Sequence, residues 1–225
     1  MNSTRKIAVI TGVLFIIATV AILVATALEP VLVGTDYLTK VSANANKVTV
    51  GALLELVAAF TSVGIAISMY PVMKGSSAGL ALGSVVFRTL EAVMYIAAVL
   101  FLLSLLTLSQ QLPLAGAANR ASLQAVGDSL LSLRQHATLA GVFAFSLGAF
   151  MYYYLFFQSQ LIPRWLSGWG IAAVILMMAA CVLSLFSDSP VNGYTLLALP
   201  IALQEIVLAV WLIVKGFSPS AIEPK

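Results

Sequence analysis

Charged residues are scarce in this sequence. Asp, Glu, Lys and Arg make up only 8% of its 225 residues, about a third of the roughly 25% that is usual in soluble domains. Apolar side chains account for 61% of the chain, and a globule of this size cannot hide that much apolar surface within one core. The composition therefore excludes an ordinary water-soluble domain and indicates that lipid is the solvent for much of the surface.

Cysteine and histidine are nearly absent. The single cysteine, Cys181, excludes disulfide frameworks, cysteine-rich zinc sites and C-x-x-C redox pairs, and the single histidine, His136, excludes sites that need several imidazoles. The 11 Lys and Arg residues give a formal net charge of +3, but they are scattered singly. They do not form the basic patch of a nucleic-acid-binding protein, so we expect no nucleic-acid partner and interpret them as determinants of membrane topology.

Long uncharged apolar runs dominate the rest of the sequence. A bilayer core about 30 Å thick requires roughly 20 apolar residues of helix, and six segments meet this condition: 7–28, 48–70, 80–108, 133–157, 165–186 and 194–214. The first segment also resembles a signal peptide, but its apolar run exceeds the usual length of roughly 7 to 15 residues, so we expect it to be retained. The sequence predicts an all-α membrane protein, a bundle of six transmembrane helices in a single transmembrane domain over residues 1–225.

Basic residues in the links predict the orientation of the bundle. An even number of spans places both termini on one side of the membrane, and Lys and Arg are enriched in short cytoplasmic links. The side with the termini carries Arg5, Lys6, Lys74, Arg164, Lys215 and Lys225, whereas the longer links opposite carry Lys40, Lys47, Arg120 and Arg134. We therefore expect both termini to be cytoplasmic.

The longest outer link contains an amphipathic pattern. Leu123, Val126, Leu130 and Leu133 recur at spacings of three and four, with polar residues between them. This periodicity predicts an outer amphipathic helix before the fourth span. Two arrangements remain open, because the helix can lie on the outer leaflet or can run straight into the fourth span and extend it above the membrane.

Aromatic residues gather where the fourth and fifth spans meet. Tyr152, Tyr153, Tyr154, Phe156 and Phe157 end the fourth span, and Trp165 and Trp169 begin the fifth. We predict that they form an aromatic belt at the membrane interface.

Several ionisable residues lie within the predicted spans, where each costs about 2.5 to 3.5 kcal/mol to insert. We predict that they form a buried polar cluster, which consists of Glu55, Arg88, Glu91, His136, Gln204 and Glu205. Arg88 and Glu91 share a helix face, and we expect Arg88 to pair with Glu91 or Glu205. Glu55 shares a face with small residues and is expected to point at a neighbouring helix and to pair with His136 or Arg134.

Most other kinds of catalytic or cofactor site are excluded, because the sequence lacks their motifs. No phosphate loop, Rossmann fingerprint, G-x-S-x-G elbow or H-E-x-x-H pair is present. We expect no cofactor and no metal, and the sequence assigns no catalytic residue. The segments that begin at Glu91 and Glu205 resemble each other over four residues, a hint of an inverted repeat of the kind that places carboxylates near the membrane midplane in transporters.

The whole chain resembles a bacterial membrane-protein family known as domain of unknown function 4386. The resemblance is carried by Arg5-Lys6 and by the segments 51–56, 87–91, 103–106, 163–167, 199–205, Trp211 and 215–217. It implies an integral membrane protein of about six helices in bacteria, which suggests the inner membrane, and it brings no activity, cofactor or catalytic residue.

Three functions remain open at this point. The buried Glu and Arg residues favour a small-molecule or ion-handling carrier or binding subunit. The alternatives are a non-transporting structural or accessory subunit that binds a partner protein or lipid, and an intramembrane enzyme that uses a buried Glu as general acid or base. Membrane lipid is the expected partner, and a second copy of the chain or another membrane protein remains open as a further one.

Overall fold

The computed structural model describes residues 3–187 and 190–218, and every regular element within these ranges is helical. The α-helices are α1 (Ser3–Leu28), α2 (Tyr37–Ala43), α3 (Ala45–Met73), α4 (Ala78–Ser109), α5 (Ala117–Ser159), α6 (Arg164–Leu185) and α7 (Thr195–Val214). Short 3-10 helices lie in three links: η1 (Glu29–Leu32), η2 (Leu112–Leu114) and η3 (Val191–Tyr194). Lys225, which was counted for orientation, and the ends of the predicted domain lie outside the described residues.

Six of these helices are long and apolar enough to cross a bilayer, which confirms the predicted all-α membrane fold and the number of spans. The predicted segments agree with α1, α3, α4, α6 and α7 to within four residues at each end. Local signals account for several of the helix ends. The Ser77 side chain accepts a hydrogen bond from the Leu80 N–H at the start of α4, and Gln160 adopts a left-handed conformation (φ 57°) at the end of α5. Helix α7 continues through Pro200.

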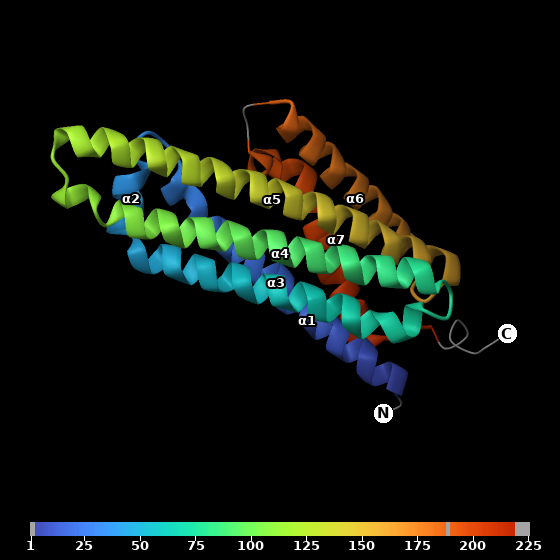
Figure 1. Cartoon of the computed structure of the whole chain (residues 1–225). Helices are drawn as coiled ribbons and strands as arrows, with labels where there is room; N and C mark the ends of the chain where they lie inside the picture. The colour runs from blue at the N-terminus through green and yellow to red at the C-terminus, as the bar shows by residue number, and fades with distance from the viewer. Residues whose placement is uncertain (1–2, 188–189, 219–225) are drawn as a thin grey trace.

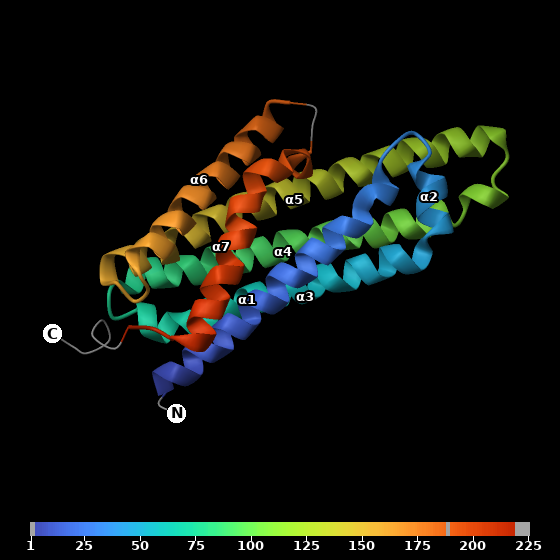
Figure 2. The same cartoon turned by 180° about the vertical axis from the view of Figure 1, so that it is seen from behind.

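The six long helices follow one another around a ring in chain order (Figures 1 and 2). Each packs against its neighbours in the order α1, α3, α4, α5, α6 and α7, and contact between α1 and α7 closes the ring. Arg5 strengthens this closure, because its guanidinium donates hydrogen bonds to the carbonyls of Leu212 (3.1 Å) and Val214 (3.3 Å) at the end of α7. Such carbonyls have no partner within their own helix.

Helix α5 is much longer than a membrane crossing requires, and it includes the amphipathic stretch. It runs unbroken for 43 residues, a length of about 65 Å at 1.5 Å per residue, roughly twice the thickness of a bilayer core. Of the two arrangements left open by the sequence, the stretch therefore extends the spanning helix. The short helix α2, which was not predicted, covers part of this stretch: Leu130 and Leu131 pack with Tyr37 and Leu38, whereas Val126 and Leu133 of the apolar pattern are about half exposed.

The end of the bundle opposite the termini therefore carries an extension made by α2 and by the outer parts of α3, α4 and α5 (Figure 1). The Tyr37 hydroxyl donates a 2.8 Å hydrogen bond to Asp128 on α5. Burial and this carboxylate raise the pKa of Tyr37 above its usual range. Gly127 permits the approach, because a Cβ there would lie 2.7 Å from the Tyr37 oxygen.

The aromatic belt was predicted only partly correctly. Tyr152, Tyr153 and Phe156 are fully buried. They belong to the core of the half of the bundle that bears the termini, where the Phe15 ring of α1 meets Tyr152 edge-on and the Phe217 ring lies tilted against Phe156. The remaining members of the set are partly or largely exposed, Trp165 most of all. The difference arises because α1, α6 and α7 enclose one face of α5, whereas aromatic composition alone does not distinguish the two faces.

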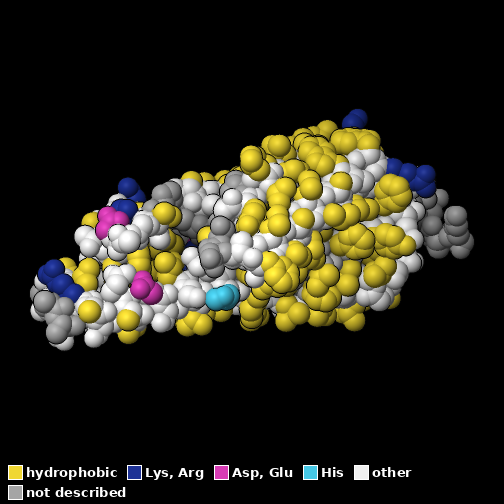
Figure 3. Space-filling view, turned by 90° about the horizontal axis from the view of Figure 1, so that it is seen from above, with side chains coloured by type: hydrophobic (Ala, Val, Ile, Leu, Met, Phe, Trp, Pro, Cys, Tyr) yellow, Lys and Arg dark blue, Asp and Glu magenta, His cyan; other side chains and the backbone are white. Residues whose placement is uncertain are grey.

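Large apolar side chains cover the outside of the broad part of the bundle (Figure 3). On α3, for example, Leu53, Phe60 and Ile67 repeat every seven residues and are each more than half exposed. Charged side chains gather instead at the two ends (Figure 3). This distribution is that of a surface solvated by lipid around its middle and by water at its ends.

Candidate functional site

A cavity of about 210 Å³ lies inside the ring and is lined by all six long helices. Ionisable side chains from four of these helices reach it: Glu55 of α3, Arg88 and Glu91 of α4, Arg134 of α5 and Glu205 of α7. Hydroxyl groups of Thr19, Thr26, Ser62, Tyr95 and Thr138 complete the polar lining. The rest of the wall is apolar and includes Leu23, Phe145 and Met177.

The first ion pair in the cavity joins α3 to α5. Arg134 Nη2 lies 2.6 Å from Glu55 Oε1, and Arg134 Nη1 lies 3.1 Å from Glu55 Oε2. Arg134 Nη1 also donates to the Ala98 carbonyl of α4 at 3.1 Å. Both side chains are buried. A bidentate contact of this kind satisfies both carboxylate oxygens and fixes the relative position of three helices.

The second ion pair lies within α4. Arg88 Nη1 lies 3.0 Å from Glu91 Oε2, and the same oxygen accepts a 3.0 Å hydrogen bond from Ser62 of α3. The guanidinium carbon of Arg88 stands 4.8 Å from the centre of the Phe145 ring. Arg88 is only 2% exposed, and its Nε has no hydrogen-bond partner among the described residues. Arg88 is therefore charge-paired but incompletely hydrogen-bonded.

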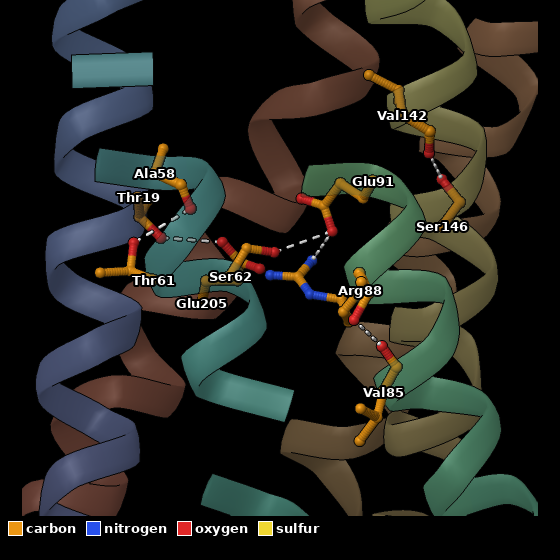
Figure 4. A network of polar contacts seen from close by, with 11 residues as sticks. Thr19, Ala58, Thr61, Ser62, Val85, Arg88, Glu91, Val142, Ser146 and Glu205 are labelled. Carbon is orange, nitrogen blue, oxygen red and sulfur yellow. Dashed lines mark hydrogen bonds and ion pairs between the residues drawn. The ribbon is translucent and has the colours of Figure 1, made fainter. Parts of the chain in front are cut away.

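Glu205 lies across the ring from Glu91, with Arg88 between them (Figure 4). Its Oε2 accepts a 2.9 Å hydrogen bond from Thr19 of α1, and Arg88 attracts it electrostatically. Because Arg88 is already paired with Glu91 and Arg134 with Glu55, Glu205 has no guanidinium of its own. The cavity thus holds three carboxylates against two guanidinium groups.

The predicted cluster contained two residues that do not reach the cavity. His136 was predicted wrongly, because its side chain is exposed and lies 3.4 Å from Ser132 on the same helix. It follows Arg134 by two positions, which places it about 200° around α5 on the outer face. Gln204 is buried, but it donates to the Leu166 carbonyl at 3.0 Å and accepts a hydrogen bond from Tyr153, so it joins α7 to α5 and α6.

Reasoning from the sequence missed two features of this site. Arg134 was placed near the outer surface, whereas the extensions of α3 and α4 bury it to 4% exposure. The hydroxyls of α1 were also missed: Thr11 contacts Ser68 at 2.7 Å, Thr19 contacts Glu205, and Thr26 lines the cavity. Spacings of eight and seven place these three threonines on one face of α1, and this pattern was the available signal.

The cavity is closed toward the termini and extends toward the opposite side. The buried aromatic core around Tyr152, Tyr153 and Phe156 fills the ring on the side of the termini. In the other direction the lining continues through Thr138 and Ala198 to Val191, which lies in the link between α6 and α7. The lining therefore reaches closer to the end of the bundle that carries the α2 extension than to the end that carries the termini.

Comparison with known proteins identifies the family of the chain. The model of a family described as Domain of unknown function (DUF4386) matches residues 10–216. The chain belongs to this family. No curated protein and no solved structure matches it. The family description assigns no activity, so the chemistry of this DUF4386 member has to be derived from its side chains.

The carboxylates of the cavity are held by guanidinium and hydroxyl groups. Within the described residues, no group of three or more His, Cys, Asp or Glu side chains is placed to hold a metal ion. Two of the three carboxylates are instead held by guanidinium groups, and the third by a hydroxyl. The cavity of this DUF4386 protein thus combines a few hydrogen-bond donors and acceptors with an otherwise apolar wall.

Proposed function

We propose that this DUF4386 protein is a small-molecule or ion-handling carrier or binding subunit, and that the cavity inside the helix ring is its site. The observation that carries the proposal is the cavity of about 210 Å³ into which five ionisable side chains project. A charged cluster that only holds helices together gains nothing from an adjacent space, because each charge facing an empty volume loses contacts and solvation.

The two ion pairs support a division of roles within the site. The Glu55 and Arg134 pair satisfies both partners and connects α3, α4 and α5, which suits a structural element. The Arg88 and Glu205 groups keep unused hydrogen-bonding capacity next to the cavity. Intramembrane charges with such capacity are typical of substrate or ion pathways, and we assign the binding role to these residues.

We further propose that the protein lies in the bacterial inner membrane with both termini in the cytoplasm, so that the cavity faces outward. The distribution of basic residues supports this orientation. Arg134, one of four basic residues counted on the outer side, is buried in an ion pair, so the outer surface is less basic than its sequence suggests. The bias toward Lys and Arg on the side of the termini is correspondingly stronger.

An accessory subunit that binds a partner membrane protein or a second copy is the second candidate. The extension formed by α2 and the outer parts of α3, α4 and α5 favours it, because this extension protrudes from one end of the bundle (Figure 1). An intramembrane enzyme has less support: among the described residues, Thr19 alone donates a hydrogen bond to Glu205, and its hydroxyl is thereby engaged.

Access of water to the cavity tests the proposed function. In a Cys181→Ser background we place a cysteine at Ala202, which lines the cavity, or at the adjacent Leu203, which is 55% exposed on the apolar outside. A membrane-impermeant methanethiosulfonate reagent is added to intact cells. We expect Ala202→Cys to react about tenfold faster than Leu203→Cys, because a polar cavity is hydrated and the bilayer core is not.

Equal or absent labelling at the two positions would contradict the proposal, since the cavity would then be dry or closed. Labelling of Ala202→Cys only in inverted membrane vesicles would retain the binding role and overturn the outward orientation.

A further inference from the structure

The charges around the deep end of the cavity set the sign of its occupant. Glu91 and Glu205 face a single guanidinium, that of Arg88 (Figure 4), and the Glu55 and Arg134 pair is neutral as a unit. The lining therefore has an excess of one negative charge when its carboxylates are ionised. In surroundings of low dielectric an uncompensated charge is costly, so a monocation is favoured and an anion is disfavoured.

Glu205 is the group that such a cation meets. Within the part of the chain that the structure describes, its carboxylate accepts one hydrogen bond, from Thr19 to Oε2, although a carboxylate has about four acceptor sites. An ammonium group supplies up to three N–H donors together with the compensating charge. It therefore satisfies Glu205 more completely than a water molecule does.

Arg88 provides a second, independent indication of a ligand. Its side chain is 2% exposed and lines the cavity, yet its Nε–H donates to no described residue. A buried donor without an acceptor costs about 1 to 3 kcal/mol. An uncharged oxygen on the same ligand satisfies this donor without adding the negative charge that Glu91 and Glu205 would repel.

The size of the cavity and the residues of its wall limit the rest of the ligand. A cavity of about 150 Å³ accommodates benzene, so the 210 Å³ found here corresponds to on the order of ten non-hydrogen atoms. Phe145, Met177, Ile22 and Leu23 provide apolar contact along the wall. A compact apolar body therefore fits beside the polar groups.

We infer that the cavity binds a small organic ammonium ion that also carries a hydroxyl or carbonyl oxygen, with its ammonium group on Glu205 and its oxygen on Arg88 Nε. This inference rests on the proposed function, because it requires the cavity to be a ligand site. It specifies the chemical class of the ligand and assigns each of its two polar groups to one residue.

A set of matched probes tests the inference on the purified full-length protein in detergent. Phenylethanolamine carries the ammonium group and the hydroxyl on a phenyl body. Phenethylamine lacks the hydroxyl, phenylethylene glycol replaces the ammonium group by a second hydroxyl, and mandelate carries a carboxylate in place of the whole aminomethyl group. Binding is measured as the concentration that half-protects Ala202→Cys, in the Cys181→Ser background, from the thiol reagent.

We expect phenylethanolamine to protect at about tenfold lower concentration than phenethylamine, because only the former satisfies Arg88. The glycol and mandelate should protect at least about thirtyfold more weakly than phenylethanolamine. Glu205→Gln should abolish the advantage of the ammonium probes over the glycol, and Arg88→Lys should abolish the advantage of phenylethanolamine over phenethylamine. Ser146→Ala is the matched control, since this buried serine bonds only within α5.

Three results would overturn the inference. One is protection by mandelate equal to that by phenylethanolamine. Another is equal protection by sodium or potassium ions, which would indicate a site for any cation. The last is an absence of protection by both ammonium probes while Ala202→Cys still reacts rapidly. This last result would overturn only the ligand class, because rapid labelling still shows a water-accessible cavity, as the proposed function requires. If Arg88→Lys or Glu205→Gln fails to fold, the comparison of the four probes on the otherwise unchanged chain still decides the question.

Discussion

Individual buried charges in this protein differ in how completely they are satisfied. Arg134 contacts both oxygens of Glu55 and a backbone carbonyl, whereas Arg88 shares one oxygen of Glu91 with Ser62 and leaves its Nε without an acceptor. The hydrogen-bonding state, rather than charge alone, therefore separates a structural residue from a binding one. We therefore expect substitution of Arg134 to affect stability and substitution of Arg88 to affect binding.

The Glu55 and Arg134 pair should dominate stability. Arg134→Gln leaves the buried Glu55 carboxylate without its counter-ion, and we expect a loss of about 3 to 5 kcal/mol. The double variant Glu55→Gln and Arg134→Gln should recover more than half of that loss, because no unpaired charge remains. The free energy of unfolding, measured by denaturant titration in detergent micelles, provides the check.

His136→Gln is the matched control for this prediction, since His136 lies two positions away on the exposed face of α5. A surface substitution of this kind should change stability by no more than about 0.5 kcal/mol. If Arg134→Gln is no less stable than His136→Gln, the ion pair does not hold the bundle together.

At the scale of helices, the ring depends on close approach at a few glycines. Where α1 meets α7, a Cβ on Gly12 would lie 2.7 Å from the Ala209 carbonyl oxygen and 2.7 Å from Ile213 Cγ1. A backbone atom cannot move aside as a flexible side chain can. The contact that closes the ring therefore has a strict requirement for a small residue, as membrane helix interfaces commonly do.

Gly12→Ala should consequently weaken the α1 and α7 interface. We expect a loss of about 1 to 3 kcal/mol from overpacking, detected as a lower midpoint of thermal unfolding in detergent. Gly79→Ala on α4 is the control, because a Cβ there meets no atom within 4 Å and the midpoint should stay the same or rise slightly. An unchanged midpoint for Gly12→Ala would show that α1 and α7 separate easily. That result would contradict a ring closed by contact between these two helices.

At the scale of the whole molecule, the ring is closed at one end and hollow toward the other. The aromatic core occupies the side of the termini, and the cavity continues to the link between α6 and α7. Under the proposed function, the orientation of the bundle in the membrane decides which compartment supplies the ligand. The membrane topology is therefore part of the proposed function as well as of the structure.

The proposed orientation has a direct measurement. In the Cys181→Ser background, single cysteines at Ser76, in the link between α3 and α4, and at Asn119, near the start of α5, are exposed on opposite ends of the molecule. We expect an impermeant thiol reagent to label Asn119→Cys in intact cells and Ser76→Cys only after permeabilisation, because basic links stay in the cytoplasm. The reverse pattern would place the cavity on the cytoplasmic side.

The sequence alone determined the class of fold, the six spans and the presence of costly charges within them, because each follows from local composition and helical period. The pairing of Arg88 with Glu91 was already accessible as one of two options, since residues three apart share a helix face. Three other features depended on which helix covers which face. They are the pairing of Glu55 with Arg134 instead of His136, the burial of Tyr152 and Tyr153, and the threonine face of α1. The cavity also arose only in three dimensions, because its lining comes from six helices whose order around the ring is set by packing between residues far apart in the chain. Tertiary structure thus decided which of the scarce charges are satisfied and which remain available to a ligand.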